Sequence, residues 1–135
     1  MRLLKGLSLA ACLSLGGCAA MVVTGIPIES AAVSRSPDGK LTRWTGRIMG
    51  KLVGDSPFEW RKVGTDYVCK GATNSSGIGS ATCSDGKIMP VEVPRQLYGS
   101  FSGSYVQKMP DGTLFASGWG GDADPDKLEK MLPPR

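Results

Sequence analysis

The sequence predicts an all-β fold: a single small antiparallel meander, open barrel or curled sheet with one disulfide and a short C-terminal helix. Three observations lead to this prediction. The 135 residues include 19 glycines and 9 prolines and are 41% hydrophobic, a composition that favours short strands joined by tight turns. Three Asp-Gly pairs mark strand reversals, and apolar residues alternate with polar ones between them. The length allows one domain.

The Asp-Gly pairs divide the chain into hairpins. Aspartate and glycine suit the positive φ angles of tight hairpin turns, so each pair predicts two antiparallel strands on either side of it. The three pairs are Asp38-Gly39, Asp85-Gly86 and Asp111-Gly112.

The clearest strand covers 41–53. One of its faces carries Trp44, Gly46 and Ile48. The basic residues on its other face are Arg43, Arg47 and Lys51. This alternation predicts a half-buried strand with its tryptophan inward. Further strands are expected around Phe58 and Trp60, around Tyr67 and Cys69, and over 88–93, 101–106 and 113–119. The expected fold is a meander of about seven antiparallel strands.

The domain boundaries follow changes in composition. Residues 18–36 are small and weakly apolar without a period, and they predict a flexible tether with room for one short strand over 21–28. Residues 37–121 form the β domain. In the tail, 122–135, Asp124 suits a helix N-cap and Pro125 the first helical position. The apolar stripe of this helix contains Leu128, Met131 and Leu132, and so short a helix needs docking against the sheet to persist.

The first residues have the pattern of an export leader. Arg2 and Lys5 precede an apolar run that ends at Leu15-Gly16-Gly17-Cys18, which resembles a bacterial lipobox. The resemblance implies removal of 1–17, acylation of Cys18, and, from the alanines that follow, an outer-membrane anchor facing the periplasm. One alternative is an ordinary signal peptide, which would leave Cys18 for a disulfide. A transmembrane helix is disfavoured, because the apolar run is well short of the roughly 20 residues that such a helix requires.

The remaining cysteines predict a disulfide between Cys69 and Cys83. Of the four cysteines, Cys12 leaves with the leader and Cys18 carries lipid, so the exported chain retains one pair. A zinc site needs more ligands than two cysteines, and the chain contains no histidine. A redox pair is disfavoured because the spacing is far from Cys-x-x-Cys.

The composition argues against catalysis and against nucleic-acid binding. Without histidine, the usual Ser-His and Cys-His pairs cannot form, and carboxylates such as Asp85 and Asp111 are explained by turns. The acidic segment 122–126 lacks the glycine and the final glutamate of a calcium loop, so we expect no metal and no cofactor. When the leader with Arg2 and Lys5 is removed, the 16 Lys and Arg residues fall to 14, against 12 Asp and Glu residues. A charge this close to balance is not typical of a nucleic-acid-binding protein.

The basic stripe of Arg43, Arg47 and Lys51 has two interpretations, and Arg61 and Lys62 follow it in sequence. It is either a solvated strand face that discourages edge pairing or a surface that attracts anionic lipid or an acidic envelope protein.

Two families supply the remaining expectations. Cys69-Lys70-Gly71, segment 77–87 and segment 111–118 resemble a group of small proteobacterial outer-membrane lipoproteins, which implies fold and location but no reaction. Tyr67-Val68-Cys69 and Ser102-Gly103-Ser104-Tyr105 more weakly resemble inhibitors of C-type lysozyme, whose late loop enters the enzyme cleft. Here that loop is one residue short and the second cysteine comes early. We therefore expect a lipid-anchored, non-enzymatic structural or binding module; the alternative is a periplasmic inhibitor of a lysozyme-like hydrolase that binds through Tyr105.

Overall fold

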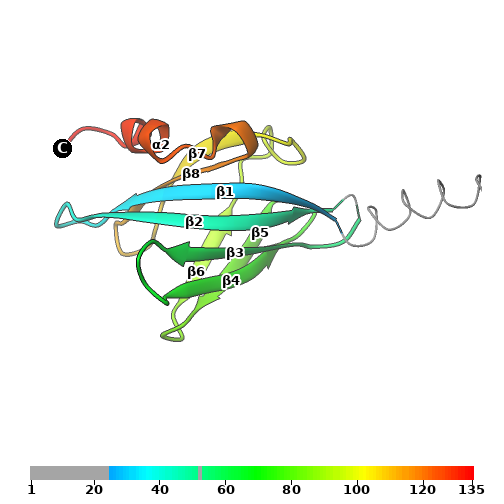
Figure 1. Cartoon of the computed structure of the whole chain (residues 1–135), viewed down its shortest axis with the longest axis horizontal. Coiled ribbons are helices and arrows are strands. Elements are labelled where there is room, and N and C mark those ends of the chain that lie inside the picture. The colour runs from blue at the N-terminus through cyan, green and yellow to red at the C-terminus, as the bar shows by residue number, and fades with distance from the viewer. Residues whose placement is uncertain (1–24, 52) are drawn as a thin grey trace, which may run out of the picture.

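The computed structural model describes residues 25–51 and 53–135, and in this part of the chain eight strands form one antiparallel sheet. The strands are β1 (Ile26–Arg35), β2 (Leu41–Gly50), β3 (Ser56–Lys62), β4 (Val68–Thr73), β5 (Ile78–Cys83), β6 (Ile88–Glu92), β7 (Gly103–Lys108) and β8 (Leu114–Trp119). They are hydrogen-bonded in the order β6-β5-β4-β3-β2-β1-β8-β7. The sheet curls into a nearly closed barrel (Figure 1), which confirms the predicted fold class.

The three Asp-Gly turns form as predicted and connect β1 to β2, β5 to β6 and β7 to β8. Their glycines have φ angles of 90°, 83° and 89°. Each aspartate accepts a hydrogen bond from the backbone N–H two residues later, at 2.8 to 3.2 Å. This bond lowers the pKa of Asp85 and Asp111, and the Ser36 hydroxyl together with the Lys40 N–H lowers the pKa of Asp38. These carboxylates therefore stabilise turns.

Strand β1 corrects the prediction of a flexible tether over 18–36. Residues 26–35 of that segment form an ordered strand between β2 and β8. The interpretation was wrong because both faces of β1 are buried. Ala32 belongs to the core inside the barrel, while Ala31 and Val33 belong to a second cluster outside it. A strand covered on both faces shows no alternation of apolar and polar residues. Residues 18–24 of the predicted tether, with Cys18, lie outside the described residues.

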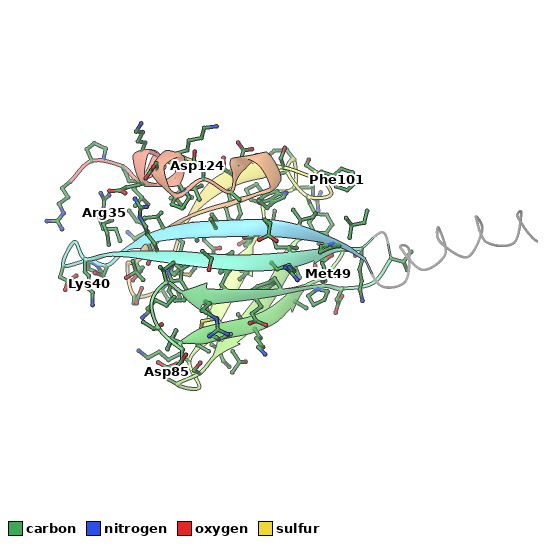
Figure 2. The ribbon with its side chains drawn as sticks, viewed as in Figure 1. Arg35, Lys40, Met49, Asp85, Phe101 and Asp124 are labelled. Carbon is green, nitrogen blue, oxygen red and sulfur yellow. A yellow bond between two sulfur atoms is a disulfide. The ribbon has the colours of Figure 1, made fainter. Side chains whose placement is uncertain are left out.

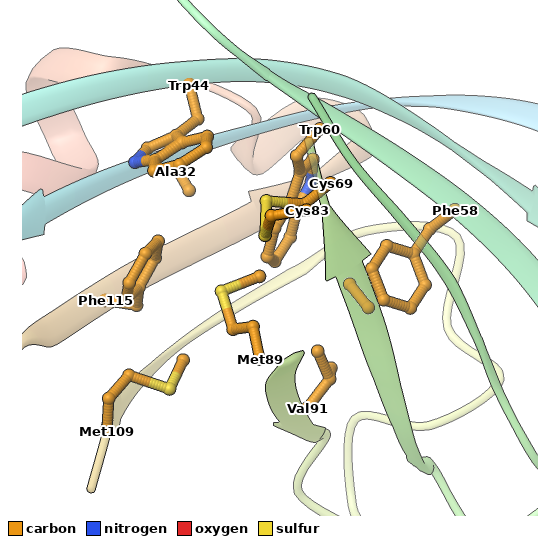
Figure 3. Packing of buried hydrophobic residues seen from close by; sticks show 11 residues of the cluster. Ala32, Trp44, Phe58, Trp60, Cys69, Cys83, Met89, Val91, Met109 and Phe115 are labelled. Atoms are coloured by element: carbon orange, nitrogen blue, oxygen red, sulfur yellow. A yellow bond between two sulfur atoms is a disulfide. The ribbon is translucent and has the colours of Figure 1, made fainter. Parts of the chain in front are cut away.

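Aromatic and sulfur-containing side chains fill much of the barrel interior (Figure 3). As predicted, β2 buries Trp44, whose ring centroid lies 5.7 Å from that of Phe115. The strand ends at Gly50, earlier than the predicted residue 53. The predicted disulfide joins Cys69 and Cys83, which are directly opposite each other on β4 and β5 inside this core.

Two buried tryptophans donate hydrogen bonds to β1. The indole N–H of Trp60 donates to the Ser30 hydroxyl at 2.8 Å, and that of Trp44 donates to the Ser34 hydroxyl at 3.1 Å. All four residues are at least nine-tenths buried. Serine is therefore needed at these inward positions of β1, because a buried indole N–H without an acceptor is destabilising.

A second layer covers the outside of β1 and β8. The 3₁₀-helix η1 (Gly120–Asp122) leads into α2 (Pro125–Met131), which Asp124 caps by accepting a hydrogen bond from the Asp126 N–H at 3.0 Å. Leu128 is fully buried against β1 and β8, and Leu132 extends this contact. The prediction of this helix is confirmed, except that Met131 is 38% exposed and does not belong to the buried stripe.

A glutamine side chain bridges the seam of the barrel. The edge strands β6 and β7 share no backbone ladder. Instead, the Gln107 side chain on β7 accepts a hydrogen bond from the Glu92 N–H and donates one to the Pro90 carbonyl oxygen on β6, both at 3.3 Å. Pro90 removes one backbone donor from β6, and proline in a sheet is tolerated mainly on such an edge strand.

Candidate functional site

An apolar cavity of about 240 Å³ lies inside the barrel at the end where β1 begins. Aliphatic and aromatic side chains form most of its wall, including Ile28, Ile48, Phe58, Trp60, Val91 and Trp119. The smaller polar side chains in the wall are Ser30, Ser56, Thr73 and Ser117. Among the described residues, no aspartate or glutamate belongs to the wall.

The cavity lies where β1 and β8 contribute small inward-facing residues between the larger side chains of the wall. Ser30 on β1 and Ser117 on β8 lie beside the cavity, whereas Trp44 and Phe115 fill the interior towards the other end. An eight-stranded barrel is wide enough either to be filled by its side chains or to hold one small ligand. In this barrel, the distribution of side-chain size along the axis leaves space at one end.

The loop between β6 and β7, residues 93–102, closes one side of the cavity. Leu97, Tyr98 and Phe101 contribute to the cavity wall. The Trp119 indole N–H donates to the Ser100 carbonyl oxygen at 2.8 Å and so fixes the loop to β8. Trp119 lies close against the start of β7, which requires a glycine there, because a Cβ on Gly103 would lie 2.6 Å from the Trp119 ring.

Tyr105 lies in the cavity wall and not at the surface. It belongs to β7, is 8% exposed, and its ring centroid lies 6.2 Å from that of Trp119. Burial raises the pKa of its hydroxyl to about 12. Its ring points into this protein's own barrel, so Tyr105 would have to leave the cavity wall to enter the cleft of a lysozyme-like hydrolase, as the inhibitor alternative requires.

Arg43 and Arg47 do not form a continuous basic surface. Both are exposed on β2, but Arg43 forms ion pairs with Asp126 at 2.9 Å and Glu129 at 3.2 Å, and Arg47 lies 3.6 Å from Glu29. Exposed pairs of this kind contribute little to stability. Their effect here is to mix the signs of charge on a face for which attraction of anions was one of two interpretations.

The two nearby lysines lie at opposite ends of the barrel. Lys51 follows β2 and belongs to the cavity wall. Lys62 was expected near the basic stripe, but its ammonium nitrogen lies 4.4 Å from the Tyr67 ring centroid and 5.4 Å from that of Trp44. Of the sequence-predicted binding residues, the structure therefore brings Lys51 and Tyr105 together at the cavity.

Other kinds of site find little support in the part of the chain that the structure describes. There, no three histidine, cysteine, aspartate or glutamate side chains gather as metal ligands. The helices of the same residues are not long and apolar enough to cross a membrane. Cys18 lies outside these residues, and its lipidation remains a prediction from the sequence.

Comparisons with protein-family models, with curated proteins and with solved structures found no match. The cavity is the main candidate site in the described part of the chain, and it was not predicted from the sequence. The sequence gives little indication of the cavity. Ser30 and Ser117 are far apart in the chain, and they indicate a space in the interior only when β1 and β8 are known to be neighbouring strands.

Proposed function

We propose that this protein is a lipid-anchored envelope lipoprotein whose barrel is a non-enzymatic binding module for a single hydrocarbon chain. The observation that carries the proposal is the apolar cavity. Its wall is aliphatic and aromatic, with hydroxyl groups inside and Lys51 as its cationic side chain among the described residues. Apolar pockets with a few polar groups are typical of small-molecule binding sites.

The volume suits one chain. A dry cavity of about 150 Å³ binds benzene, so by proportion the 240 Å³ cavity accommodates roughly ten carbon atoms. Burying that number of methylene groups is favourable by about 8 kcal/mol. Loss of ligand freedom offsets several kcal/mol of this, so we expect a dissociation constant between micromolar and millimolar.

The wall supports binding in preference to catalysis. General acid–base chemistry needs a group that exchanges a proton near neutral pH. The titratable groups in the described wall are Lys51, Tyr98 and Tyr105, and burial raises the pKa of Tyr105 to about 12, so that this hydroxyl stays protonated. It can donate a hydrogen bond to a ligand but is a poor proton acceptor.

Tryptophan fluorescence tests chain binding, because Trp60 and Trp119 belong to the wall and Trp44 does not. The mature chain, exported as Cys18→Ser behind a non-lipid leader, is titrated with brominated decanoic acid, in which the bromine quenches a neighbouring indole. We expect saturable quenching that persists in Trp44→Phe.

Two cavity-filling variants control this measurement. Ser117→Leu and Thr73→Leu place extra volume in the wall and should abolish quenching, whereas Ser80→Leu on the exposed face of β5 should not. A cooperative unfolding transition in urea reports that each variant is folded. Absence of quenching in the wild type would contradict the proposal. So would quenching in both filled variants that is as strong as in the wild type.

The anchor is tested separately. Metabolic labelling with a fatty acid should mark the wild-type protein and not Cys18→Ser, and the wild type should enter the detergent phase on phase separation. Two or more acyl chains hold a protein on a membrane stably, while one binds only marginally. Wild-type protein that remains in the aqueous phase would refute the anchor.

A further inference from the structure

Exposed apolar side chains gather at the cavity end of the barrel. We define the apolar rim as Ile26, Val53, Ile78 and Phe101, of which Val53 is 72% and Phe101 68% exposed. They come from the start of β1, the β2–β3 connection, the start of β5 and the loop before β7. Ile26 and Phe101 also line the cavity. Figure 2 shows Phe101 at the end of the barrel where β1 begins, with Lys40 at the opposite end.

The chemistry of the two ends differs. The residues directly before and after each rim residue are uncharged, and the charged residues of the β2–β3 connection and of the loop before β7 are Lys51, Asp55 and Arg95. At the opposite end, Leu41, Val63 and Ile88 are also exposed, but each directly follows a lysine, and the three Asp-Gly turns lie there. Burying an ion in a bilayer is costly, whereas an exposed aromatic ring is favourable at the membrane interface. The rim is therefore the end suited to a lipid surface.

The length of the N-terminal chain selects the same end. Seven residues lie between Cys18 and Ile26, and the eight Cα–Cα steps between the two residues span at most about 28 Å. A lipid on Cys18 therefore keeps the start of β1 close to the bilayer. To bring the opposite end to the membrane, this segment would have to run back along the ten residues of β1, a distance of about 33 Å. The tether is too short for that orientation.

We infer that the apolar rim docks on the phospholipid bilayer, so that the mouth of the cavity opens onto the membrane and takes its hydrocarbon chain directly from it. This inference rests on the proposed anchor and chain-binding function. In this orientation, Phe101 and Val53 contact the acyl region. Lys51, beside the mouth, lies at the level of the anionic head groups, as lysines at membrane interfaces do.

Photo-crosslinking tests the orientation in the full acylated protein. A photoreactive benzoylphenylalanine is introduced at Phe101 or, as the matched control, at Ile88, which is 71% exposed at the opposite end. Each protein is reconstituted in vesicles of phosphatidylethanolamine and phosphatidylglycerol and irradiated. We expect an adduct with the mass of one phospholipid at position 101, in several-fold higher yield than at 88. A second pair, Val53 and Val63, should show the same contrast.

Equal adduct yields at the two ends, or no lipid adduct at positions 101 and 53, would overturn the docking inference. This failure is distinct from failure of the proposed function, because chain binding is measured without a membrane. Quenching by brominated decanoic acid without a lipid adduct at 101 would retain the binding module and refute its docking. An adduct at 101 without quenching would retain docking and refute chain binding.

Discussion

Replacing Ser30 by alanine removes the acceptor of the Trp60 indole. The donor–acceptor distance is 2.8 Å, and both residues are 5% exposed. In the unfolded chain, the indole N–H of the variant still binds water, whereas in the folded barrel it faces an apolar wall. The substitution therefore destabilises the folded state through one unsatisfied buried donor.

The expected magnitude follows from the cost of that donor. Leaving a buried neutral donor without a partner costs about 1–3 kcal/mol, and we take about 2 kcal/mol as the central value. The described part of the chain has about 110 residues, and the unfolding entropy near the midpoint is about 2.1 cal/mol/K per residue. The melting temperature should therefore fall by roughly 9 °C. The midpoint in urea should fall by about 1 M.

Urea unfolding of a double-mutant cycle isolates the hydrogen bond. The cycle comprises Ser30→Ala, Trp60→Phe and the double variant, and phenylalanine has no N–H to satisfy. The serine substitution should therefore cost little in the Trp60→Phe background, with a coupling energy of about 1–2 kcal/mol. Ser80→Ala, at an exposed position of β5, should change stability by less than about 0.5 kcal/mol.

Additive free energies in this cycle would refute the reasoning. So would a loss in Ser30→Ala no larger than that in Ser80→Ala. Either result would mean that the Trp60 indole finds another acceptor in the folded state.

Three further predictions concern the core, the outer layer and pH. Replacing Cys69 and Cys83 by alanine removes the constraint on a loop of about 15 residues and should cost about 3 kcal/mol in the chain-entropy model, measured by urea unfolding with and without reductant; an unchanged wild-type midpoint on reduction would count against it. Leu128→Ala should cost about 2–5 kcal/mol, because this fully buried side chain holds α2 against β1 and β8, and protease cleavage within α2 should increase. The pKa of Tyr105 is raised to about 12 from an unfolded value of about 10. The folded state therefore binds this proton more tightly, and the free energy of unfolding should fall as the pH rises through that window; Tyr105→Phe should reduce this dependence and leave the part that comes from Tyr67, whose pKa burial also raises.

Local features of the chain could be predicted because they depend on neighbouring residues. The Asp-Gly turns need only a side chain that accepts the N–H two residues later and a glycine with positive φ, as Asp111 and Gly112 show. Strand β2 alternates between faces because only one of them is buried. The Asp124 cap and Pro125 define the start of α2 in the same local way.

The prediction failed where burial came from distant parts of the chain. Strand β1 carries small residues because the interior of the barrel lies on one face and α2 on the other. The strand predicted over 101–106 is present as β7, but the sequence did not show which way Tyr105 points, and its ring turns inward because β7 pairs with β8 in the barrel.

The sequence by itself determined most of the strands after β1, the hairpin turns, the disulfide pair and the short helix, because each of these follows from a local pattern or from cysteine count. Only the tertiary structure decided that β1 is central, that Arg43 is paired with α2, and that a cavity remains at one end. A cavity is the volume left between side chains that are far apart in the sequence. Ser30 and Ser117 leave space together because antiparallel pairing of β1 with β8 aims both at the same region of the interior.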